Sequence, residues 1–263
     1  MITLNSDAAS TSLSKTTKAI LNEYGIKLNK NLGQNYLIDR NKRDQIIQFG
    51  NLTKDDVVLE IGPGIGTLTI ELAKRVKKVI AIEQDSNICQ ILENRLKKEN
   101  IDNVELINDD ALNVEFPKFD KIISNLPYQI SSPITFKFLN YDFQLAILMY
   151  QKEFASRMNG KVGSKDYSRL SAMLYFKCDV DLLTGVSAES FIPKPKVDSA
   201  VVRLTPKLPE LNGQLKHLNI NEINEKDFKT YSKFVKALFQ HRNKKVKNAL
   251  IKSVIMCLES IKA

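Results

Sequence analysis

The chain has 263 residues, of which 43% are hydrophobic, and it carries a formal charge of +9 with an isoelectric point near 9.3. This composition suits one substantial globular domain with a small second one and excludes disorder over most of the chain. The positive charge favours a polyanionic partner, either nucleic acid or an acidic membrane surface. No apolar stretch approaches the roughly 20 residues of a membrane span, so nucleic acid is the better candidate.

Cysteine and histidine usage limits the chemistry further. The three cysteines (Cys89, Cys178 and Cys257) are far apart, and none belongs to a CxxC pair, which predicts reduced thiols in a cytoplasmic protein. The N-terminus also lacks the apolar core of a signal peptide. Only two histidines exist, His217 and His241, so the chain has little material for a histidine-based metal centre or a Ser-His triad.

The first half of the chain alternates between helical and strand patterns. Residues 1–25 are rich in Ser, Thr, Asn and Lys and predict a mobile tail or a basic arm. A helical pattern over 41–49 and a polar connector come next. Strands are then expected at 57–59, 79–82 and 104–107, and helices between them at about 68–76 and 87–98. This βαβ spacing predicts a parallel sheet covered on both faces, with ligands at the carboxyl ends of its strands.

A glycine-rich turn follows the first expected strand. Gly62, Gly64 and Gly66 give the spacing GxGxG, in which small residues let the backbone approach a ligand. A dinucleotide site usually has GxGxxG, which would need glycine at Thr67, and a P-loop would need Gly-Lys-Ser/Thr after the turn. Both of these interpretations are weakened, while an ordinary tight strand-to-helix turn stays open.

Carboxylates end the next two strands. Glu83 comes about 20 positions after Gly62, the usual place for an acidic residue that binds a ribose diol. Asp110 follows the third strand and could accept from an adenine amino group, although it or Asp109 could instead cap the next helix. The glycine turn, Glu83 and Asp110 together describe a pocket for an adenosine that carries no pyrophosphate. S-adenosylmethionine fits that description.

The most informative motif is Asn-Leu-Pro-Tyr at 125–128, directly after the buried-looking run 121–124. Methylation of the exocyclic amine of adenine needs acceptors for two N–H bonds and a flat surface under the ring, because the nitrogen lone pair is delocalised into the base. Asn125 and the carbonyls near Pro127 can accept, and Tyr128 can stack. An ordinary strand-ending turn with Tyr128 in the core is the alternative.

The C-terminal part contains one more strand pattern and a basic cluster. The run 200–204 is expected to complete the sheet, and the polar stretch 205–225 separates it from a small helical domain. The basic cluster suits phosphate contacts that position RNA without reading its bases, but it could equally be a solvated helix face. Its members are His241, Arg242, Lys244, Lys245 and Lys247, of which Arg242 and the three lysines are the expected RNA-binding residues.

These motifs and their order resemble the ribosomal RNA adenine dimethyltransferase family, over nearly all of residues 27–250. The resemblance is carried by NLGQNYLID at 31–39, the glycine turn at 60–67, NLPYQISSP at 125–133, residues 151–158 and 166–171, and FIPKPKVDS at 191–199; residues 239–245 are similar to the archaeal version. The family has a Rossmann-like class I S-adenosylmethionine-dependent methyltransferase domain, of the α/β class. The implied division is a mobile tail over 1–25, the methyltransferase domain over 26–205 and a small, shortened helical RNA-binding domain over 206–263.

The resemblance also implies roles for individual residues. The expected cofactor-binding set is Gln34, Asn35, Leu37, Gly62, Gly64, Glu83, Asp110 and Asn125, and the expected catalytic set is Asn125, Pro127, Tyr128 and Phe191. In this picture the target adenine is flipped out of its RNA and stacked on Tyr128, with Phe191 as a second aromatic wall. Phe191 and its neighbouring prolines could instead only stiffen a linker.

The implied activity is N6-dimethylation of adjacent adenines in the 3′-terminal hairpin of small-subunit ribosomal RNA, during ribosome biogenesis, with S-adenosylmethionine and without a metal. The implied partner is that RNA or the pre-ribosomal small subunit, and we expect a cytoplasmic monomer without membrane association. Two other functions stay open, which are methylation of large-subunit RNA of the antibiotic-resistance type and non-catalytic RNA binding in assembly. The intact set of Gly62, Glu83, Asp110 and Asn125 favours catalysis.

Overall fold

The computed structural model describes residues 12–26, 35–207, 225–241 and 243–253. The chain divides into two compact units, one with residues 1–155 and 181–205 and the other with 156–180 and 206–263. The first unit ends at residue 205, where the sequence also places a boundary. Residues 156–180, however, group with the C-terminal helices. The division into a tail and two domains stays a prediction.

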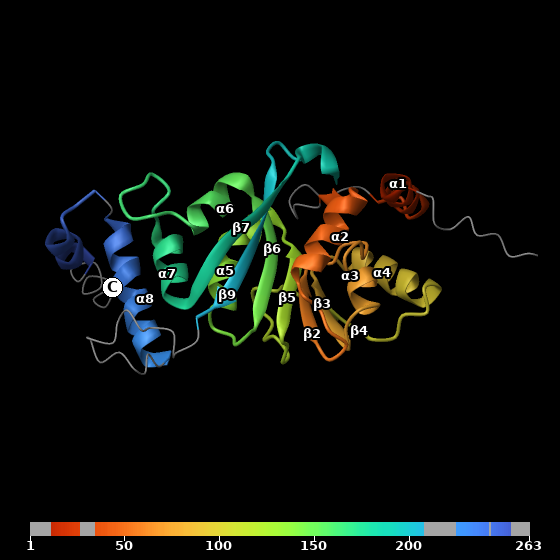
Figure 1. The fold of residues 1–263 in the computed structure, drawn as a ribbon, viewed down its shortest axis with the longest axis horizontal. Helices are drawn as coiled ribbons and strands as arrows, with labels where there is room; N and C mark the ends of the chain where they lie inside the picture. The colour runs from red at the N-terminus through yellow and green to blue at the C-terminus, as the bar shows by residue number, and fades with distance from the viewer. Residues whose placement is uncertain (1–11, 27–34, 208–224, 242, 254–263) are drawn as a thin grey trace, which may run out of the picture. The chain divides into compact units, whose positions relative to one another are not determined.

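A seven-stranded sheet forms the centre of the first unit (Figure 1), with the strand order β4-β3-β2-β5-β6-β9-β7. Its strands are β2 (Val57–Ile61), β3 (Lys78–Glu83), β4 (Val104–Asn108), β5 (Lys121–Asn125), β6 (Leu145–Gln151), β7 (Cys178–Val186) and β9 (Ser199–Pro206). The strands from β4 to β6 are parallel to their neighbours, and β9 is antiparallel to β6. The strand order reverses between β2 and β5, and open α/β sheets bind ligands outside the carboxyl ends at such a point.

The central strands are buried along their whole length. In β3, β5 and β6 every residue except one or both ends is buried. Because alternate side chains of a strand point to opposite faces, continuous burial means that both faces of the sheet are covered. This confirms the covered parallel sheet expected from the βαβ spacing and the Rossmann-like α/β fold implied by the family resemblance.

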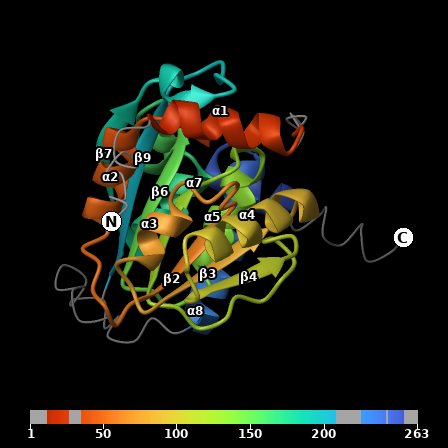
Figure 2. The same cartoon turned by 90° about the vertical axis from the view of Figure 1, so that its right-hand side faces the viewer.

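Helices and short 3₁₀ turns connect these strands (Figure 2). They are α2 (Arg40–Phe49), α3 (Thr69–Ala73), α4 (Ser86–Lys98), η3 (Tyr128–Ile130), α5 (Ser131–Phe138), α6 (Lys152–Met158) and η4 (Ala188–Ser190). The Asp85 side chain caps α4 by accepting from the amide of Asn87 at 3.0 Å, which is the usual role of an aspartate before a helix.

The expected N-terminal tail contains a helix, α1 (Leu13–Glu23). Its buried residues Ile20 and Leu21 belong to an apolar cluster with Tyr36 and Ile65. A tail was expected because Ser, Thr and Lys dominate the composition there. The burial of Ile20 and Leu21 holds this helix against Tyr36 and Ile65. Residues 13–23 are therefore helical and packed, which differs from the expected mobile tail.

A second sheet has two antiparallel strands, β1 (Tyr36–Leu37) and β8 (Phe191–Ile192). The amide of Ile38 donates to the carbonyl of Ser190 at 2.8 Å, and the Ser190 hydroxyl donates to Asp39 at 3.2 Å. These bonds fix the segment 35–39 against a part of the chain about 150 positions later.

The second unit contains α7 (Arg169–Lys177), α8 (Glu225–Gln240) and helical residues 246–253. Phe176 of α7 stacks on Tyr231 of α8 with ring centroids 4.6 Å apart. The small helical region expected at the C-terminal end is therefore present.

No helix in the described part of the chain is both long enough and apolar enough to cross a membrane.

Candidate active site

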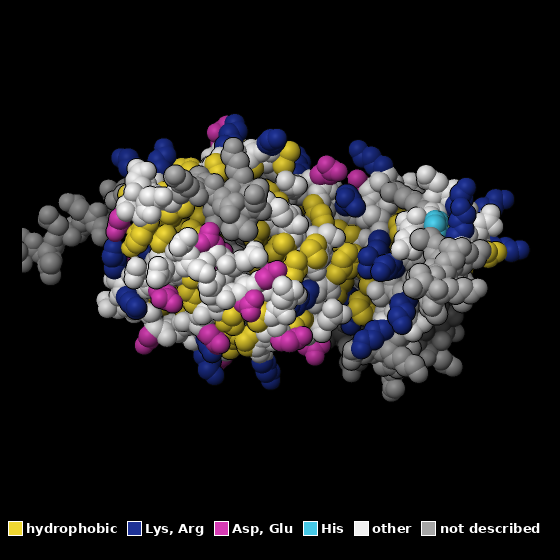
Figure 3. Space-filling model, turned by 180° about the vertical axis from the view of Figure 1, so that it is seen from behind, with side chains coloured by type: hydrophobic (Ala, Val, Ile, Leu, Met, Phe, Trp, Pro, Cys, Tyr) yellow, Lys and Arg dark blue, Asp and Glu magenta, His cyan; other side chains and the backbone are white. Residues whose placement is uncertain are grey.

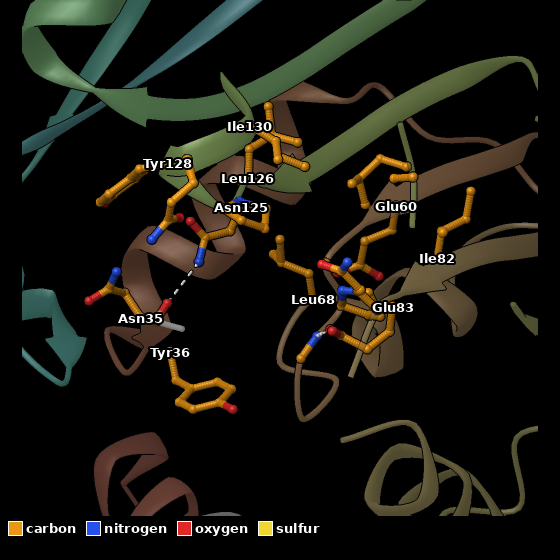
Figure 4. A pocket seen from close by; sticks show the side chains of 18 of the residues that line it. Asn35, Tyr36, Glu60, Leu68, Ile82, Glu83, Asn125, Leu126, Tyr128 and Ile130 are labelled. Carbon is orange, nitrogen blue, oxygen red and sulfur yellow. Dashed lines mark hydrogen bonds between the residues drawn. The ribbon is translucent and has the colours of Figure 1, made fainter. Parts of the chain in front are cut away.

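A cavity lies at the carboxyl ends of β2, β3 and β5 (Figure 4). Its walls come from residues 35–37, 60–64, 67–68, 82–84, 109–111 and 125–130. Five of the segments singled out in the sequence therefore meet in one place, although they are spread over about 95 positions of the chain. The cavity occupies the reversal point of the strand order, where such sheets bind ligands.

The glycine turn forms one wall, and all three of its glycines have positive φ angles, +66° at Gly62, +55° at Gly64 and +86° at Gly66. A Cβ atom on Gly62 would lie 3.0 Å from the ring of Pro127, and one on Gly64 would lie 2.9 Å from the ring of Tyr36. Both positions therefore need glycine for backbone conformation and for space. The Gly64 amide also donates to the Glu83 carboxylate at 3.1 Å, which ties the turn to the end of β3.

Two carboxyl groups lie beside this turn. Glu60 is 1% exposed, and its Oε2 atom has no hydrogen-bond partner among the described residues. Burial raises the pKa of Glu60 to about 8, and the nearby charge of Glu83 adds to the effect. Burial also raises the pKa of Glu83, although amides of Asp85 and Gly64 donate to it. Unused acceptor capacity of this kind suits a ligand that brings N–H or O–H donors or a positive charge.

Asp110 closes another side of the cavity. Its carboxylate accepts from the Leu112 amide at 2.9 Å and from the Asn113 side chain at 3.2 Å. The described residues between β4 and β5 form turns and no helix, so Asp110 fixes its own turn and caps no helix. Asp110 also lines the cavity. A carboxylate that is fixed by its own turn is well placed to accept further hydrogen bonds from a ligand.

Lys137 of α5 holds the loop that carries Asp110. Its ammonium group donates to the carbonyls of Ala111 at 2.9 Å and Leu112 at 3.2 Å, and also to that of Val114. Burial lowers the pKa of Lys137, but nearby carboxylates oppose this effect. One cation therefore links the loop after β4 to the helix that follows the Asn-Leu-Pro-Tyr motif.

The motif itself ends β5 and opens into the cavity. The Asn125 amide nitrogen donates to the Asn35 carbonyl at 3.2 Å (Figure 4), which leaves the Asn125 side-chain oxygen as the group that can accept from a ligand. Tyr128 is half-buried and lines the cavity, and its hydroxyl is hydrogen-bonded to that of Ser199 at 2.5 Å. Tyr128 is therefore not a core residue.

Comparison with known proteins agrees with this site. The family model for ribosomal RNA adenine dimethylase matches residues 25–256. The chain belongs to this family. Among its relatives, the probable ribosomal RNA small subunit methyltransferase A of Methanosphaera stadtmanae is 52% identical over 237 residues, which are 90% of this chain and 82% of the relative. That of Methanothermobacter thermautotrophicus is 47% identical over 90% of this chain and 80% of its own length.

Solved structures show the same fold. A dimethyladenosine transferase from Plasmodium falciparum aligns with a TM-score of 0.68 at 37% identity, covering 78% of this chain and 70% of its own. The 23S rRNA methyltransferase ErmE aligns with a TM-score of 0.65 at 29% identity, covering 83% and 84%. Both belong to the kind of methyltransferase that the sequence patterns predicted.

Most of the residues expected at a dimethylase site line the cavity. Those that do are Asn35, Leu37, Gly62, Gly64, Glu83, Asp110, Asn125, Pro127 and Tyr128. Gln34 lies outside the described residues. Sequence reasoning overlooked Glu60 and Tyr36, which also line the cavity. A carboxylate inside the apolar run 57–61 was the available signal for Glu60, because a charged residue is rarely placed in a buried strand without a purpose.

Phe191 is placed differently from the expectation. Its ring is 2% exposed and belongs to the apolar core together with Leu37, Val186 and Val201, and it is not among the residues that line the cavity. In β8 it lies opposite Leu37 of β1. A large apolar ring gains more from burial in this position than from exposure to a cavity. The placement argues against a second aromatic wall and makes Phe191 a support for the Leu37 wall.

The basic cluster belongs to the second unit. Lys244, Lys245 and Lys247 are exposed, and Arg242 lies outside the described residues. On the face drawn in Figure 3, Lys and Arg side chains predominate over the second unit, whereas Asp and Glu side chains are interspersed over the first. Such a surface suits contacts with phosphate groups. Within the described residues, no group of three or more His, Cys, Asp or Glu side chains could hold a metal ion.

Proposed function

We propose that this chain transfers methyl groups from S-adenosylmethionine to the exocyclic amines of adenines in small-subunit ribosomal RNA. One observation carries the proposal, which is that the glycine turn, two strand-end carboxylates and the Asn-Leu-Pro-Tyr motif line a single cavity. Membership of the adenine dimethylase family supplies the reaction. The names of the archaeal relatives supply the small-subunit substrate.

The side chains around the cavity fit S-adenosylmethionine. Gly62 and Gly64 allow the rings of Pro127 and Tyr36 to pack against the turn, where a Cβ atom would lie too close to them. The Glu60 oxygen that has no partner among the described residues offers an acceptor in the same wall. We assign Glu83 to the ribose hydroxyls, Asp110 to the adenine, and the glycine turn to the methionine part. When bound, S-adenosylmethionine supplies a methyl group on a positively charged sulfur atom.

Asn125 and Pro127 would hold the target amine. The Asn125 side-chain oxygen accepts one N–H of the amine. The Pro127 carbonyl accepts the other. This carbonyl already accepts from the Ile130 amide at 3.2 Å, and its second lone pair is available for the amine. Two acceptors below the ring plane favour a pyramidal nitrogen over the planar ground state, and this difference lowers the barrier. Tyr128 supplies the flat surface on which the flipped base stacks.

Positioning supplies most of the rate in this scheme, because the side chains hold the amine in line for displacement. No strong base is required. After each transfer, the methylated nitrogen is acidic enough to lose its proton to water. A site with room for one methyl group then allows a second round, which gives dimethyladenosine.

The test is transfer of labelled methyl groups to unmodified small ribosomal subunits, with the modified nucleotides mapped by mass spectrometry. We expect dimethyladenosine at adjacent adenines of the 3′-terminal hairpin. Large ribosomal subunits are the matched alternative substrate, since ErmE, a 23S rRNA methyltransferase, is 29% identical to this chain. Label in large-subunit RNA alone would contradict the proposed substrate. Cofactor binding without transfer to either subunit would favour a non-catalytic assembly factor.

The proposal extends to a monomer that acts in the cytoplasm. Light scattering of the purified protein, alone and with a small subunit, tests the first part. Fractionation of cells that express a tagged chain tests the second.

A further inference from the structure

The Tyr128 hydroxyl is attached to a second part of the chain. It lies 2.5 Å from the hydroxyl of Ser199, which is 0% exposed and begins β9. We propose that Ser199 is a positioning residue, which holds the Tyr128 ring in the orientation in which the target adenine stacks. This inference rests on the proposed function, because it specifies how one wall of that site is kept in place.

The sheet topology brings these residues together. β9 runs antiparallel to β6, so its first residue, Ser199, lies opposite Gln151 at the carboxyl end of β6. β6 is parallel to β5, in which Asn125 lies opposite Met149. The amino end of one strand thus meets the carboxyl ends of two others, at the edge where the cavity opens. A parallel β9 would place Ser199 at the opposite edge of the sheet.

The backbone next to Ser199 is fixed by the preceding residue, Asp198. The Asp198 carbonyl accepts from the Lys152 amide at 2.9 Å, and its carboxylate accepts from the Ala188 amide at 2.9 Å. A serine side chain has one rotatable bond before its hydroxyl, so a fixed backbone leaves that oxygen few positions. Tyr128 must therefore adapt to Ser199.

An anchor of this kind limits the movement of the ring. With its Cβ attached to the backbone and its hydroxyl bonded to Ser199, the ring cannot change χ1 without breaking a hydrogen bond at a buried atom. Burial raises the pKa of Tyr128, and the hydrogen bond opposes this only in part, so the phenol keeps its proton at neutral pH. The free protein thus already presents the ring in one orientation, so less conformational entropy is lost when the base binds.

This role also explains the motif FIPKPKVDS at 191–199. Its first two residues form β8, which pairs with β1 and supports the wall that contains Leu37. Its last residue holds Tyr128, which also lines the cavity. The motif therefore supports two residues that line the cavity, Leu37 and Tyr128, and does not line the cavity itself.

The experiment compares Ser199→Ala, Tyr128→Phe and the double variant with the unaltered protein. Methyl transfer is measured in single turnovers at saturating S-adenosylmethionine on unmodified small subunits. We expect each single variant to lose about five- to tenfold in rate, and the double variant to lose no more, since all three remove the same bond. Tyr128→Ala, which also removes the ring, should lose far more. Affinity for the cofactor should be unchanged in the first three variants.

A matched control is Tyr150→Phe. The Tyr150 hydroxyl also forms a buried bond with another hydroxyl, that of Thr135 at 2.7 Å, but Tyr150 does not line the cavity. Thermal unfolding of all variants corrects for lost stability. If Tyr150→Phe slows transfer as much as Tyr128→Phe, or if the losses of Ser199→Ala and Tyr128→Phe add, the positioning role is wrong.

A second measurement does not depend on catalysis. In protein labelled with 3-fluorotyrosine, the ¹⁹F resonance of Tyr128 is assigned as the one absent from Tyr128→Phe. We expect Ser199→Ala to shift and sharpen this resonance, because the ring gains motion, and Tyr150→Phe to leave it unchanged. An unchanged resonance in Ser199→Ala would overturn the inference. Absence of methyl transfer by the unaltered protein would instead overturn the proposed function, and the resonance would still decide the role of Ser199.

Discussion

The two ends of the central strands use their polar groups in opposite ways. At the amino end, Lys121 and Asp56 are 7% and 6% exposed and form an ion pair at 2.9 Å. The Lys121 ammonium also donates to the Asn51 carbonyl at 2.7 Å, and the Thr53 amide donates to Asp56 at 2.6 Å. Each buried charge at this end is thus matched within the protein, as a buried pair requires if it is not to destabilise the fold.

At the carboxyl end the balance is different. The Glu60 Oε2 atom and the Tyr36 hydroxyl are buried without a hydrogen-bond partner among the described residues. The pKa values report the contrast. Burial would raise the pKa of Asp56, but its hydrogen bonds and Lys121 bring it below the usual value, whereas burial raises the pKa of Glu60 to about 8. The buried charges at the amino end are paired within the protein, whereas some buried polar atoms at the carboxyl end keep capacity for a ligand.

The largest expected effect removes the acceptor for the target amine. Asn125→Ala should slow methyl transfer by about 10²–10³-fold, since one aligned polar contact to the reacting group is worth that much. Cofactor binding, measured by calorimetry, should stay detectable. Asn140→Ala changes an exposed asparagine on the same unit and is the control. Transfer by Asn125→Ala at the unaltered rate would contradict the assignment of this end of the sheet to catalysis.

The next effect concerns the opposite end. Lys121→Met leaves the buried Asp56 carboxylate without its cation and should lower the free energy of unfolding by about 3 kcal/mol, as measured by urea denaturation. The rate of transfer per folded molecule should not change. Lys78→Met, which breaks an exposed pair with Glu105 at 2.6 Å, should cost under about 1 kcal/mol. A large loss of rate in folded Lys121→Met would contradict the assignment of the amino end to stability alone.

The pH dependence of stability should follow from the same pair. The folded pKa of Asp56 lies below its usual value, so its contribution is complete above the unfolded pKa and is lost as the pH falls through the folded pKa. Lys121→Met should reduce this acid-dependent part of the unfolding free energy. If the unfolding free energy falls equally in both proteins at low pH, the pair of Asp56 and Lys121 is not responsible for that fall.

A smaller effect is expected from Glu60→Gln, which keeps the shape of the side chain and removes its ability to ionise. Because the folded pKa of Glu60 is raised from 4.5 to about 8, stability falls as the pH rises through this window, and the variant should show less of that fall. Affinity for S-adenosylmethionine should drop roughly tenfold if the free oxygen serves the ligand. Unchanged affinity would mean that Glu60 is only a buried charge.

The smallest effect is expected at the loop that carries Asp110. Lys137→Met removes the donor to the carbonyls of Ala111 and Leu112. We expect KM for the cofactor to rise by about three- to tenfold with kcat nearly unchanged, since the loop holds only one end of the ligand. Lys137→Arg, which keeps a cation, should recover part of the loss. A change in kcat alone would place Lys137 with the reacting groups instead.

Sequence alone was sufficient for the elements that depend on local pattern. Apolar runs predicted β2, β3, β4, β5 and β9, although not β6 and β7. The order of GxGxG, Glu83, Asp110 and the 125–128 motif predicted the wall of the cavity. Strand periodicity and turn chemistry are properties of neighbouring residues, so they can be read without knowledge of the fold. Parallel connection then places all strand ends at one edge, and this brings the motifs together.

Tertiary structure decided the features that depend on distant partners. The motif at 191–199 does not reveal that Phe191 turns into the core while Ser199 holds Tyr128, 71 positions away. The pairing of Asp56 with Lys121, 65 positions apart, was equally hidden. Burial and hydrogen bonding belong to the assembled sheet, because a side chain's environment is set by strands that are neighbours in space. Sequence thus determined which chemical groups this protein has at its site, and the fold decided which of them are held by the protein and which are left for a ligand.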